Sequence, residues 1–411
     1  MQKFEKHSPV VVTEVTTKHE LRQFMQYPNR LYADNPNYIP SFYGDDLSDW
    51  TPGKNPAFDY CEARCWLAWR DGEIVGRIGA ILSHKANDKF GTHRMRFSQV
   101  DFVDDSEVSA ALFGTVERWA RQKGCDQVHG PLGFTDMDRE GMLVEGFDRR
   151  SLFITNYNAP YYPEHLTRLG YRKDVDWIEY RISVPAPGSA EAERLHKLSE
   201  FILKRKHLHV ATLHHKSEYG PFVRQVFELV NAAYAPLYGV VELSDEQIER
   251  YANKFIPLVD PDFVCFVLDE QDKLVAFGVT TLDPSPALKH SDGRLFPFGW
   301  AEVLNDLHHG DTLIMLLTAV RPDLQTEGIN AVMMDHVCQS CNRHGVRFAE
   351  TGPMLELNDH ILAQWKRLEK EQHKRRRCFI KDLDHGINAA NAAAAAQAEA
   401  PEAAPAAESA E

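Results

Sequence analysis

The sequence reads Leu313-Ile-Met-Leu-Leu-Thr-Ala-Val320-Arg-Pro-Asp-Leu-Gln325-Thr-Glu-Gly328-Ile-Asn330-Ala331 at the place that decides its fold. A continuous apolar run ends at Val320, which is typical of a buried strand. A short turn containing Gly328 follows, and the pattern then predicts a helix over Asn330–Arg343. Free backbone N–H groups at a helix N-terminus bind phosphate, and a glycine there lets the backbone approach the anion. The stretch therefore predicts a strand, a phosphate-binding turn and a helix.

The elements around this stretch occur twice in the chain. The predicted hairpin arms Cys65–Trp69 and Ile74–Leu82 correspond to Phe263–Leu268 and Leu274–Leu282. Each hairpin is followed by a strand, a helix ending at glycine, a Gly-Pro pair, a further helix and a closing strand. The corresponding pieces are Phe97–Val103 and Leu313–Val320, Gly124 and Gly345, Gly130-Pro131 and Gly352-Pro353, Tyr162–Leu169 and Asn358–Leu368, and Asp176–Ile182 and Arg377–Leu383. This order predicts two copies of one α/β fold, each a mixed, mostly antiparallel sheet covered by helices.

Two changes in composition suggest the domain boundaries. Pro and Gly in Val184–Ala190 indicate a linker, and the chain after Ile387 is almost all Ala, Glu, Pro, Gln and Ser. We expect a first domain over 1–184, a linker and helix over 185–204, and a second domain over 205–385. The tail, 386–411, has no large apolar residue after Ile387 to offset the entropy of ordering, so we expect it to be disordered.

Composition and charge limit the class of protein. The net charge of −14 disfavours binding to nucleic acid. The sequence has no apolar run long enough to span a bilayer, and its N-terminus lacks the apolar core of a signal peptide. Seven cysteines at irregular spacing suggest free thiols in a reducing compartment. We therefore expect a cytoplasmic protein.

The stretch quoted above resembles the acetyl-CoA signature of GNAT acyltransferases. In that signature Gln or Arg, two further residues, Gly, one residue and Gly or Ala open the helix. Gln325 and Gly328 match, whereas Asn330 stands where a small residue is usual. The resemblance implies acyl-CoA as co-substrate, with strand atoms along the pantetheine arm and turn amides at the pyrophosphate. The implied cofactor-binding residues are Thr318, Ala319 and Val320 on the strand, then Gln325, Thr326, Glu327, Gly328, Ile329, Asn330 and Ala331.

The first half has no such turn. Its strand continues as Ser98–Asp105, which places acidic residues where the pyrophosphate would lie. The fold class that the resemblance implies is therefore two tandem GNAT-like acyl-CoA N-acyltransferase folds, an α/β class with a mixed sheet, in which the first is degenerate and contributes surface.

Longer motifs narrow the resemblance, which extends over roughly residues 10–385. They are Gly130–Asp136, Glu140–Asp148, Asn156–Pro163 and Gln372–Phe379. They resemble a bacterial GNAT-like family similar to the bacterial ceramide synthases, which transfer a fatty acyl chain from a thioester to a sphingoid amine. This implies an acyl-CoA-dependent N-acyltransferase for a lipid-like amine, with a peripheral contact to the inner membrane. Two alternatives stay open: an acetyltransferase for a small amine or a protein lysine, and a non-catalytic CoA-binding or scaffold protein.

Aminolysis of a thioester needs a base, because the acceptor ammonium has a pKa of about 10 in water. Glu350, at the end of a predicted strand, is the first candidate, and a solvated strand-end carboxylate is the alternative reading. His308 and His309 precede the cofactor strand and are further candidates, although an exposed loop is the simpler reading for both.

The departing thiolate also needs a proton donor. GNAT enzymes often use a tyrosine on the helix after the Gly-Pro strand, but the sequence has none between Asn358 and Lys374. Tyr157 from the first half and His360 are the candidates instead. Tyr161, Tyr162 and His373 remain as alternatives, and packing is a competing explanation for each.

Two charged clusters have open readings. Asp136, Asp138, Glu140, Glu145 and Asp148 crowd one glycine-containing loop, which is either an amine or cation site or a solvated acidic loop. The basic run His373–Arg377 either meets CoA phosphates or lipid headgroups, or is a solvated charge run beside a strand.

Two further patterns are also open. Cys338-Gln-Ser-Cys341 with His344 has metal-like spacing, but it falls inside a predicted helix without a second ligand pair, so we expect no metal. Leu295–Trp300 is a dense apolar cluster that is core if buried, and a contact for an acyl chain or a membrane if exposed.

Overall fold

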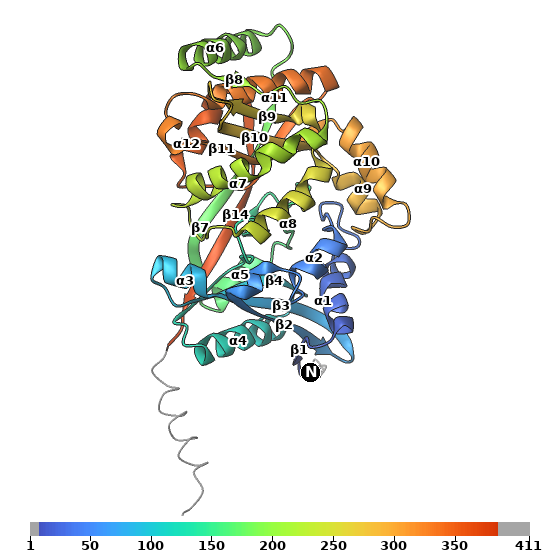
Figure 1. Ribbon diagram of the computed structural model, residues 1–411. Coiled ribbons are helices and arrows are strands. Elements are labelled where there is room, and N and C mark those ends of the chain that lie inside the picture. Colours follow the sequence, from blue (N-terminus) through green and yellow to red (C-terminus); the bar gives the residue numbers. More distant parts are fainter. Residues whose placement is uncertain (1–7, 385–411) are drawn as a thin grey trace, which may run out of the picture.

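The computed structural model describes residues 8–384, so the expected disordered tail, 386–411, lies outside the described residues. The described strands form one mixed sheet in the order β1-β2-β3-β4-β5-β14-β7-β12-β11-β10-β9-β8, while β6 pairs with β14 and β13 with β7. Figure 1 shows the sheet running through both halves, with helices packed on it. The expected α/β class with a mixed, mostly antiparallel sheet is confirmed.

The first half closely follows the predicted order. Its helices and strands are β1 (Val11–Glu14), α1 (Lys18–Leu31), α2 (Tyr43–Asp49), β2 (Cys61–Arg70), β3 (Glu73–Ser83), α3 (His84–Phe90), β4 (Arg94–Phe102), α4 (Ser106–Gln122), β5 (Gln127–Gly130), β6 (Met142–Glu145), α5 (Tyr162–Arg168) and β7 (Arg172–Ser183).

The second half repeats this order after α6 (Ala190–Lys206). It continues with β8 (His209–Val210), α7 (Gly220–Tyr234), α8 (Asp245–Phe255), β9 (Val264–Leu268), β10 (Leu274–Leu282), α9 (Ser285–His290), α10 (Gly299–His309), β11 (Thr312–Val320), α11 (Asn330–His344), β12 (Phe348–Thr351), β13 (Met354–Leu355), α12 (Asp359–Ala363) and β14 (Lys370–Asp382). The predicted glycines after α4 and α11 have φ of +75° at Gly124 and +72° at Gly345, as a left-handed helix end requires.

The two halves exchange their closing strands. β14, from the end of the chain, lies between β5 and β7 of the first half. β7, from the first half, lies between β14 and β12. Each half is therefore completed by a strand of the other. Figure 1 shows β7 and β14 next to each other where they extend from one half to the other.

The basic run His373–Arg377 lies inside this exchanged pair. β14 begins at Lys370, before the predicted start at Arg377. His373, Lys374 and Arg376 are buried, so the reading as a solvated charge run is wrong. Arg376 and Lys374 are fully buried and both reach Glu179 of β7, at 2.5 Å and 3.4 Å. The cause is the antiparallel register with β7, which places acidic residues of that strand beside the cations of β14.

Apolar side chains form a core in each half. In the first, Phe97, Phe102 and Phe113 pack between the sheet and α4. In the second, Phe266 and Phe277 pack beneath α7 and α8. All seven cysteines are free and buried. Among residues 8–384, no helix has the length and apolar character needed to cross a membrane.

Candidate functional site

The predicted cofactor strand separates from its neighbour. β11 and β12 run parallel and pair from Thr312 and Phe348 to Met315 and Thr351. A register shift against β10 leaves Leu316 as an extra residue, a β-bulge at the point of separation. Beyond it β12 ends while β11 continues, so the backbone of β11 faces an opening on this side.

A cavity of about 170 Å³ occupies this opening. It lies between β11 and α11 on one side and the segment from α12 to β14 on the other. Its walls are mainly apolar and include Met315, Met333, Met334, Met354, Trp365 and Leu368. Methionine side chains adapt to a flexible apolar guest. Cys338 and Cys341, the pair with metal-like spacing, line the same cavity.

The N-terminus of α11 lies open beside this cavity. No side chain caps the helix, and Gly328 in the preceding turn has φ of +81°. Gln325 and Thr326 are exposed. Glu327 is 2.5 Å from Lys206, which ends the basic last turn of α6. Free amides and a neighbouring basic helix end can hold an anion here.

The structure places the predicted cofactor residues along one continuous path. Thr318 and Asn330 line the cavity, and Ala319, Val320 and Ile329 are buried beneath it. The turn from Gln325 to Gly328 connects β11 to α11. Asn330 and Ala331 are the first two residues of that helix. Their role in holding a cofactor stays a prediction.

The corresponding turn of the first half is closed by its own side chains. Asp105 caps α4, accepting hydrogen bonds from the backbone N–H of Glu107 at 2.8 Å and of Val108 at 3.4 Å. Its carboxylate also pairs with Arg70 at 2.5 Å. A carboxylate already occupies this helix N-terminus, so a phosphate would meet negative charge there.

Two tyrosines of the first half fill the opening beside its strand. The hydroxyl oxygen of Tyr162 accepts a hydrogen bond from the backbone N–H of Phe102, at the end of β4, at 2.8 Å. The Tyr161 hydroxyl donates to the Phe102 carbonyl at 2.5 Å. These bonds satisfy backbone groups at the end of β4, the strand that corresponds to β11.

Glu350, the predicted base, lies in a mostly buried polar cluster on β12. Its carboxylate is 3.3 Å from the ammonium of Lys374 and 3.7 Å from His373. Burial raises its pKa, while Lys374 acts in the opposite direction. Burial also lowers the pKa of His373 to about 3, so this ring is neutral at pH 7. The structure thus gives Glu350 an ion-pair partner.

The structure does not bring the other two predicted catalytic residues to Glu350. Tyr157 is buried in the core of the first half, where its hydroxyl accepts a hydrogen bond from Asn35 at 2.7 Å. His360 is exposed on α12, next to Ile361, which lines the cavity. His308 and His309 are exposed at the end of α10.

Sequence reasoning missed Tyr234, at the end of α7. Tyr234 lines the cavity, and its hydroxyl donates to the carbonyl of Thr318 at 2.8 Å. Burial and the negative charge of Asp136 raise its pKa to about 12. The sequence offered no signal, because the predicted donor was sought only after the Gly-Pro pair.

Asp136 and Glu140 lie on the loop between β5 and β6 of the first half, and Asp136 lies within electrostatic reach of Tyr234 in the second half. Burial raises the pKa of Asp136 to about 6, and that of Glu140 well above its ordinary value. Among the described residues, neither carboxylate accepts a hydrogen bond from another residue. Asp138, between them, accepts from the N–H groups of Phe134 and Thr135 and so shapes the loop. Desolvated carboxylates without partners are candidates for acid–base chemistry.

Replacing Asp136 by Asn is expected to stabilise the protein at high pH. A carboxyl with a folded pKa near 6 lowers the free energy of unfolding above that pH, and has no such effect once it is protonated in both states. We expect a gain of about 1–3 kcal/mol at pH 8 that disappears below about pH 4. Urea unfolding at the two pH values measures it. Asp148→Asn, at an exposed carboxylate, is the control, and equal stability at pH 8 would contradict the expectation.

Another cavity, of about 80 Å³ and with polar walls, lies between the halves. Asp45, Asp49 and Asp138 line it together with Lys254 of α8. An apolar cavity of about 70 Å³ beneath α7 and α8 shares Phe255 with it. This apolar cavity also shares Leu317, at the bulge, with the cavity beside β11.

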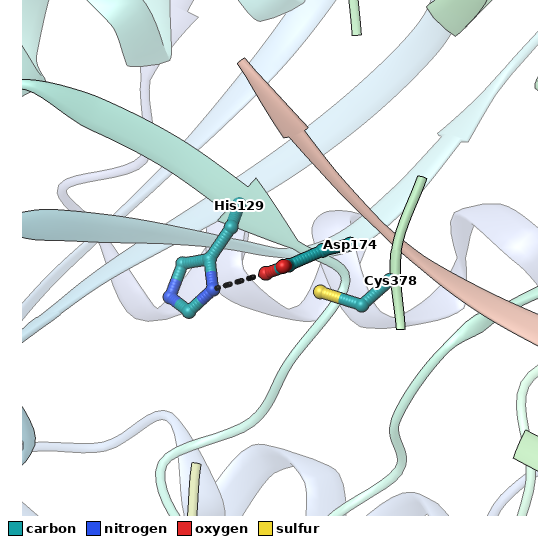
Figure 2. A group of neighbouring side chains, drawn as sticks. All are labelled: His129, Asp174 and Cys378. Carbon is teal, nitrogen blue, oxygen red and sulfur yellow. Dashed lines mark ion pairs between the residues drawn. The ribbon is translucent and has the colours of Figure 1, made fainter. Parts of the chain in front are cut away.

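One group of side chains has the composition of a metal site. Figure 2 shows His129, Asp174 and Cys378, whose potential ligand atoms lie within 4.8 Å of one another. However, the Tyr238 hydroxyl lies 2.9 Å from His129 Nδ1 and donates to Asp174 at 2.5 Å. Burial lowers the pKa of His129 to about 4. The Tyr238 hydroxyl thus hydrogen-bonds with two members of this group and ties the α7–α8 connection to the first half.

Two known proteins align with most of the chain, whereas no protein-family model matches it. Protein YghO of Escherichia coli (strain K12) is 27% identical over 383 residues, covering 91% of this chain and 95% of the relative. A bacterial ceramide synthase of Caulobacter vibrioides is 28% identical over 299 residues, covering 71% of this chain and 75% of the relative.

Solved structures share the fold. A tandem GNAT protein from the clavulanic acid biosynthesis pathway superposes with a TM-score of 0.52 at 14% identity, covering 91% of this chain and 99% of that protein. A fungal glucosamine N-acetyltransferase region has a TM-score of 0.50 at 11% identity, covering 92% of this chain and 38% of that one. This likeness confirms the predicted fold, and at 11% and 14% identity it shows the fold alone.

Proposed function

Because the chain has a tandem GNAT fold, we propose that it transfers an acyl group from acyl-CoA to an amine. The observation that carries the proposal is the cavity where β11 and β12 separate, beside the uncapped N-terminus of α11. The turn at Gly328 would hold the pyrophosphate, and β11 from Thr318 to Val320 would pair with the pantetheine arm. The cofactor residues predicted from the sequence are kept in this proposal.

Tyr234, which lines the cavity, and Asp136, which lies within electrostatic reach of Tyr234, suit the chemistry. The amine nitrogen attacks the thioester carbonyl and its proton passes to the carboxylate of Asp136. The carbon–sulfur bond then breaks, and the thiolate takes a proton from the hydroxyl of Tyr234. A base with a pKa of about 6 is charged at pH 7. Glu350 keeps its predicted role as an alternative base, although its pairing with Lys374 favours a structural part.

The first half would contribute surface and the carboxylate base, and no second cofactor. Asp105 closes the helix N-terminus that would receive the pyrophosphate. Tyr161 and Tyr162 bond the strand edge that would receive the pantetheine. Both observations support the expectation that this half is degenerate.

The acceptor we propose is a lipid-like amine and the donor a fatty acyl-CoA. The relative named a bacterial ceramide synthase supports this class. The apolar walls beside β11 and the apolar cavity that shares Leu317 offer room for a long acyl chain. Carboxylates of the cavity between the halves would attract the ammonium of the acceptor. A cytoplasmic protein in peripheral contact with the inner membrane would meet both substrates.

Thermal unfolding with CoA, acetyl-CoA and palmitoyl-CoA tests the proposal. A ligand of the folded state at about 100 times its dissociation constant stabilises by about 2.7 kcal/mol. We expect palmitoyl-CoA to raise Tm by much more than acetyl-CoA does. Thr326→Glu should remove most of both shifts, because it adds negative charge to the turn that would hold the pyrophosphate.

The matched control is Ser217→Glu, which adds the same charge at an exposed position of the second half. It should respond like the wild type. Equal shifts with acetyl-CoA and palmitoyl-CoA would favour a small acyl donor. If no CoA species shifts Tm, the cofactor site is wrong and a scaffold role replaces this proposal.

A further inference from the structure

The segment from Arg294 to Trp300 presents aromatic side chains to solvent. It lies between α9 and α10, which form an insertion between β10 and β11 at one side of the molecule (Figure 1). Phe296 is 82% exposed and Phe298 is 76% exposed, and Leu295, Trp300 and Leu304 beside them are also exposed. The sequence left open whether this cluster is core or contact, and the structure decides that it is not core.

The backbone holds these side chains outward. The N–H of Trp300 donates to the carbonyl of Leu295 at 2.8 Å, and its indole donates to the carbonyl of Pro297 at 3.1 Å. The base of the segment is fixed to the first half, where Tyr43 N–H donates to the Gly293 carbonyl at 3.0 Å. Lys289 also donates to the carbonyl of Asn35 at 2.8 Å. The rings are therefore presented by a braced projection.

The ends of the described chain lie elsewhere. Asp384 follows β14, which pairs with β5 of the first half, and the N-terminal strand β1 forms the outer edge of that half. Across residues 8–384, no segment covers Phe296 or Phe298, as their exposed fractions show.

We propose that this projection inserts into the surface of a lipid bilayer. Phe296 and Phe298, which stand in solvent on a segment braced against the first half, can insert between lipid headgroups without a matching protein surface. Arg294 is the one charged residue from Gly293 to Ala301, and its guanidinium fits the phosphate of a lipid headgroup. Because the whole chain carries −14, attraction to anionic lipid is small, and the apolar contact supplies the affinity.

Flotation of the full-length protein with phosphatidylcholine vesicles tests the proposal, without CoA or amine. We expect the wild type to float with the vesicles, with little loss in high salt. The double variant Phe296→Ser and Phe298→Ser should lose at least tenfold in partitioning, because each ring loses its transfer to the bilayer. Leu357→Ser is the matched control: Leu357 is 76% exposed on another element, and its removal should leave flotation unchanged.

Three results would overturn the proposal. They are a wild type that stays unbound, a double variant that floats equally well, and a wild-type dimer in light scattering that the double variant abolishes. The last result would assign the projection to contact with a second copy. Acyl transfer to a water-soluble amine, measured separately, should be unchanged in the double variant. Flotation without any acyl transfer would reject the proposed function and leave this inference standing.

Discussion

Replacing Asp136 by Asn is expected to lower kcat for amine acylation at least about 100-fold, with acyl-CoA binding unchanged. The carboxylate lies within electrostatic reach of Tyr234, which lines the cavity beside β11. No other residue among those described donates a hydrogen bond to it. Its removal therefore takes away a base and leaves no broken pair behind. Steady-state rates with palmitoyl-CoA and a sphingoid amine measure the effect.

The pH profile separates this role from a structural one. For the wild type, kcat/KM should fall as the pH drops below about 6, since Asp136 is then protonated. Asp136→Asn should lose this limb, while Asp148→Asn should keep both rate and profile. If Glu350→Gln instead removes the limb and Asp136→Asn retains it, the predicted base Glu350 replaces Asp136. Loss of activity without gain of stability at pH 8 would point to a distorted loop.

Substitutions at the two candidate bases, Glu350 and Asp136, should also have opposite effects on the stability of the protein. Glu350→Gln removes one partner of a mostly buried ion pair with Lys374, which is destabilising. Asp136→Asn removes a desolvated charge that has no partner, which is stabilising. A residue kept at a cost to stability and needed for rate fits a functional site. Comparing the two variants therefore tests the assignment from two directions.

The repeat and the place of the turn at Gly328 could be predicted because their signals are local. Apolar runs, turn glycines and Gly-Pro pairs each report on a few neighbouring residues. The turn at Gly328 and the strand ending at Val320 were found this way, and the structure has both where the sequence placed them. The strand bulge at Leu316 was not predicted, since a single extra residue leaves no compositional mark.

The electrostatic proximity of Asp136 to Tyr234 could not be predicted, because the two residues lie in different halves. Nothing in the sequence near either residue reports how the halves pack. The same holds for the run His373–Arg377, which looked solvated by composition. Its neutralising partner, Glu179, lies almost 200 residues earlier, on the strand that the first half lends to the second.

The exchanged strands predict that neither half folds alone. We expect residues 1–187 and 188–411, expressed separately, to show no cooperative unfolding transition. The first fragment lacks β14 between β5 and β7, and the second lacks β7 between β14 and β12. Each would expose long unpaired strand edges. The first fragment would also leave Glu179 without Arg376 and Lys374, and the second would leave Arg376 without Glu179, which costs about 3–5 kcal/mol per broken pair where the remaining charge stays buried.

Mixing the fragments during refolding should restore a 1:1 complex that binds palmitoyl-CoA. The control is the full-length chain with a protease site between Pro187 and Gly188, where the structure has neither helix nor strand. Cleaved after folding, it should keep both pieces together and most of its Tm, because the cut leaves the strand pairing intact. A monomeric 188–411 fragment that folds and binds palmitoyl-CoA alone would contradict this. In that case β7 would be a covering strand of the second half, and the cavity beside β11 would be complete without the first half.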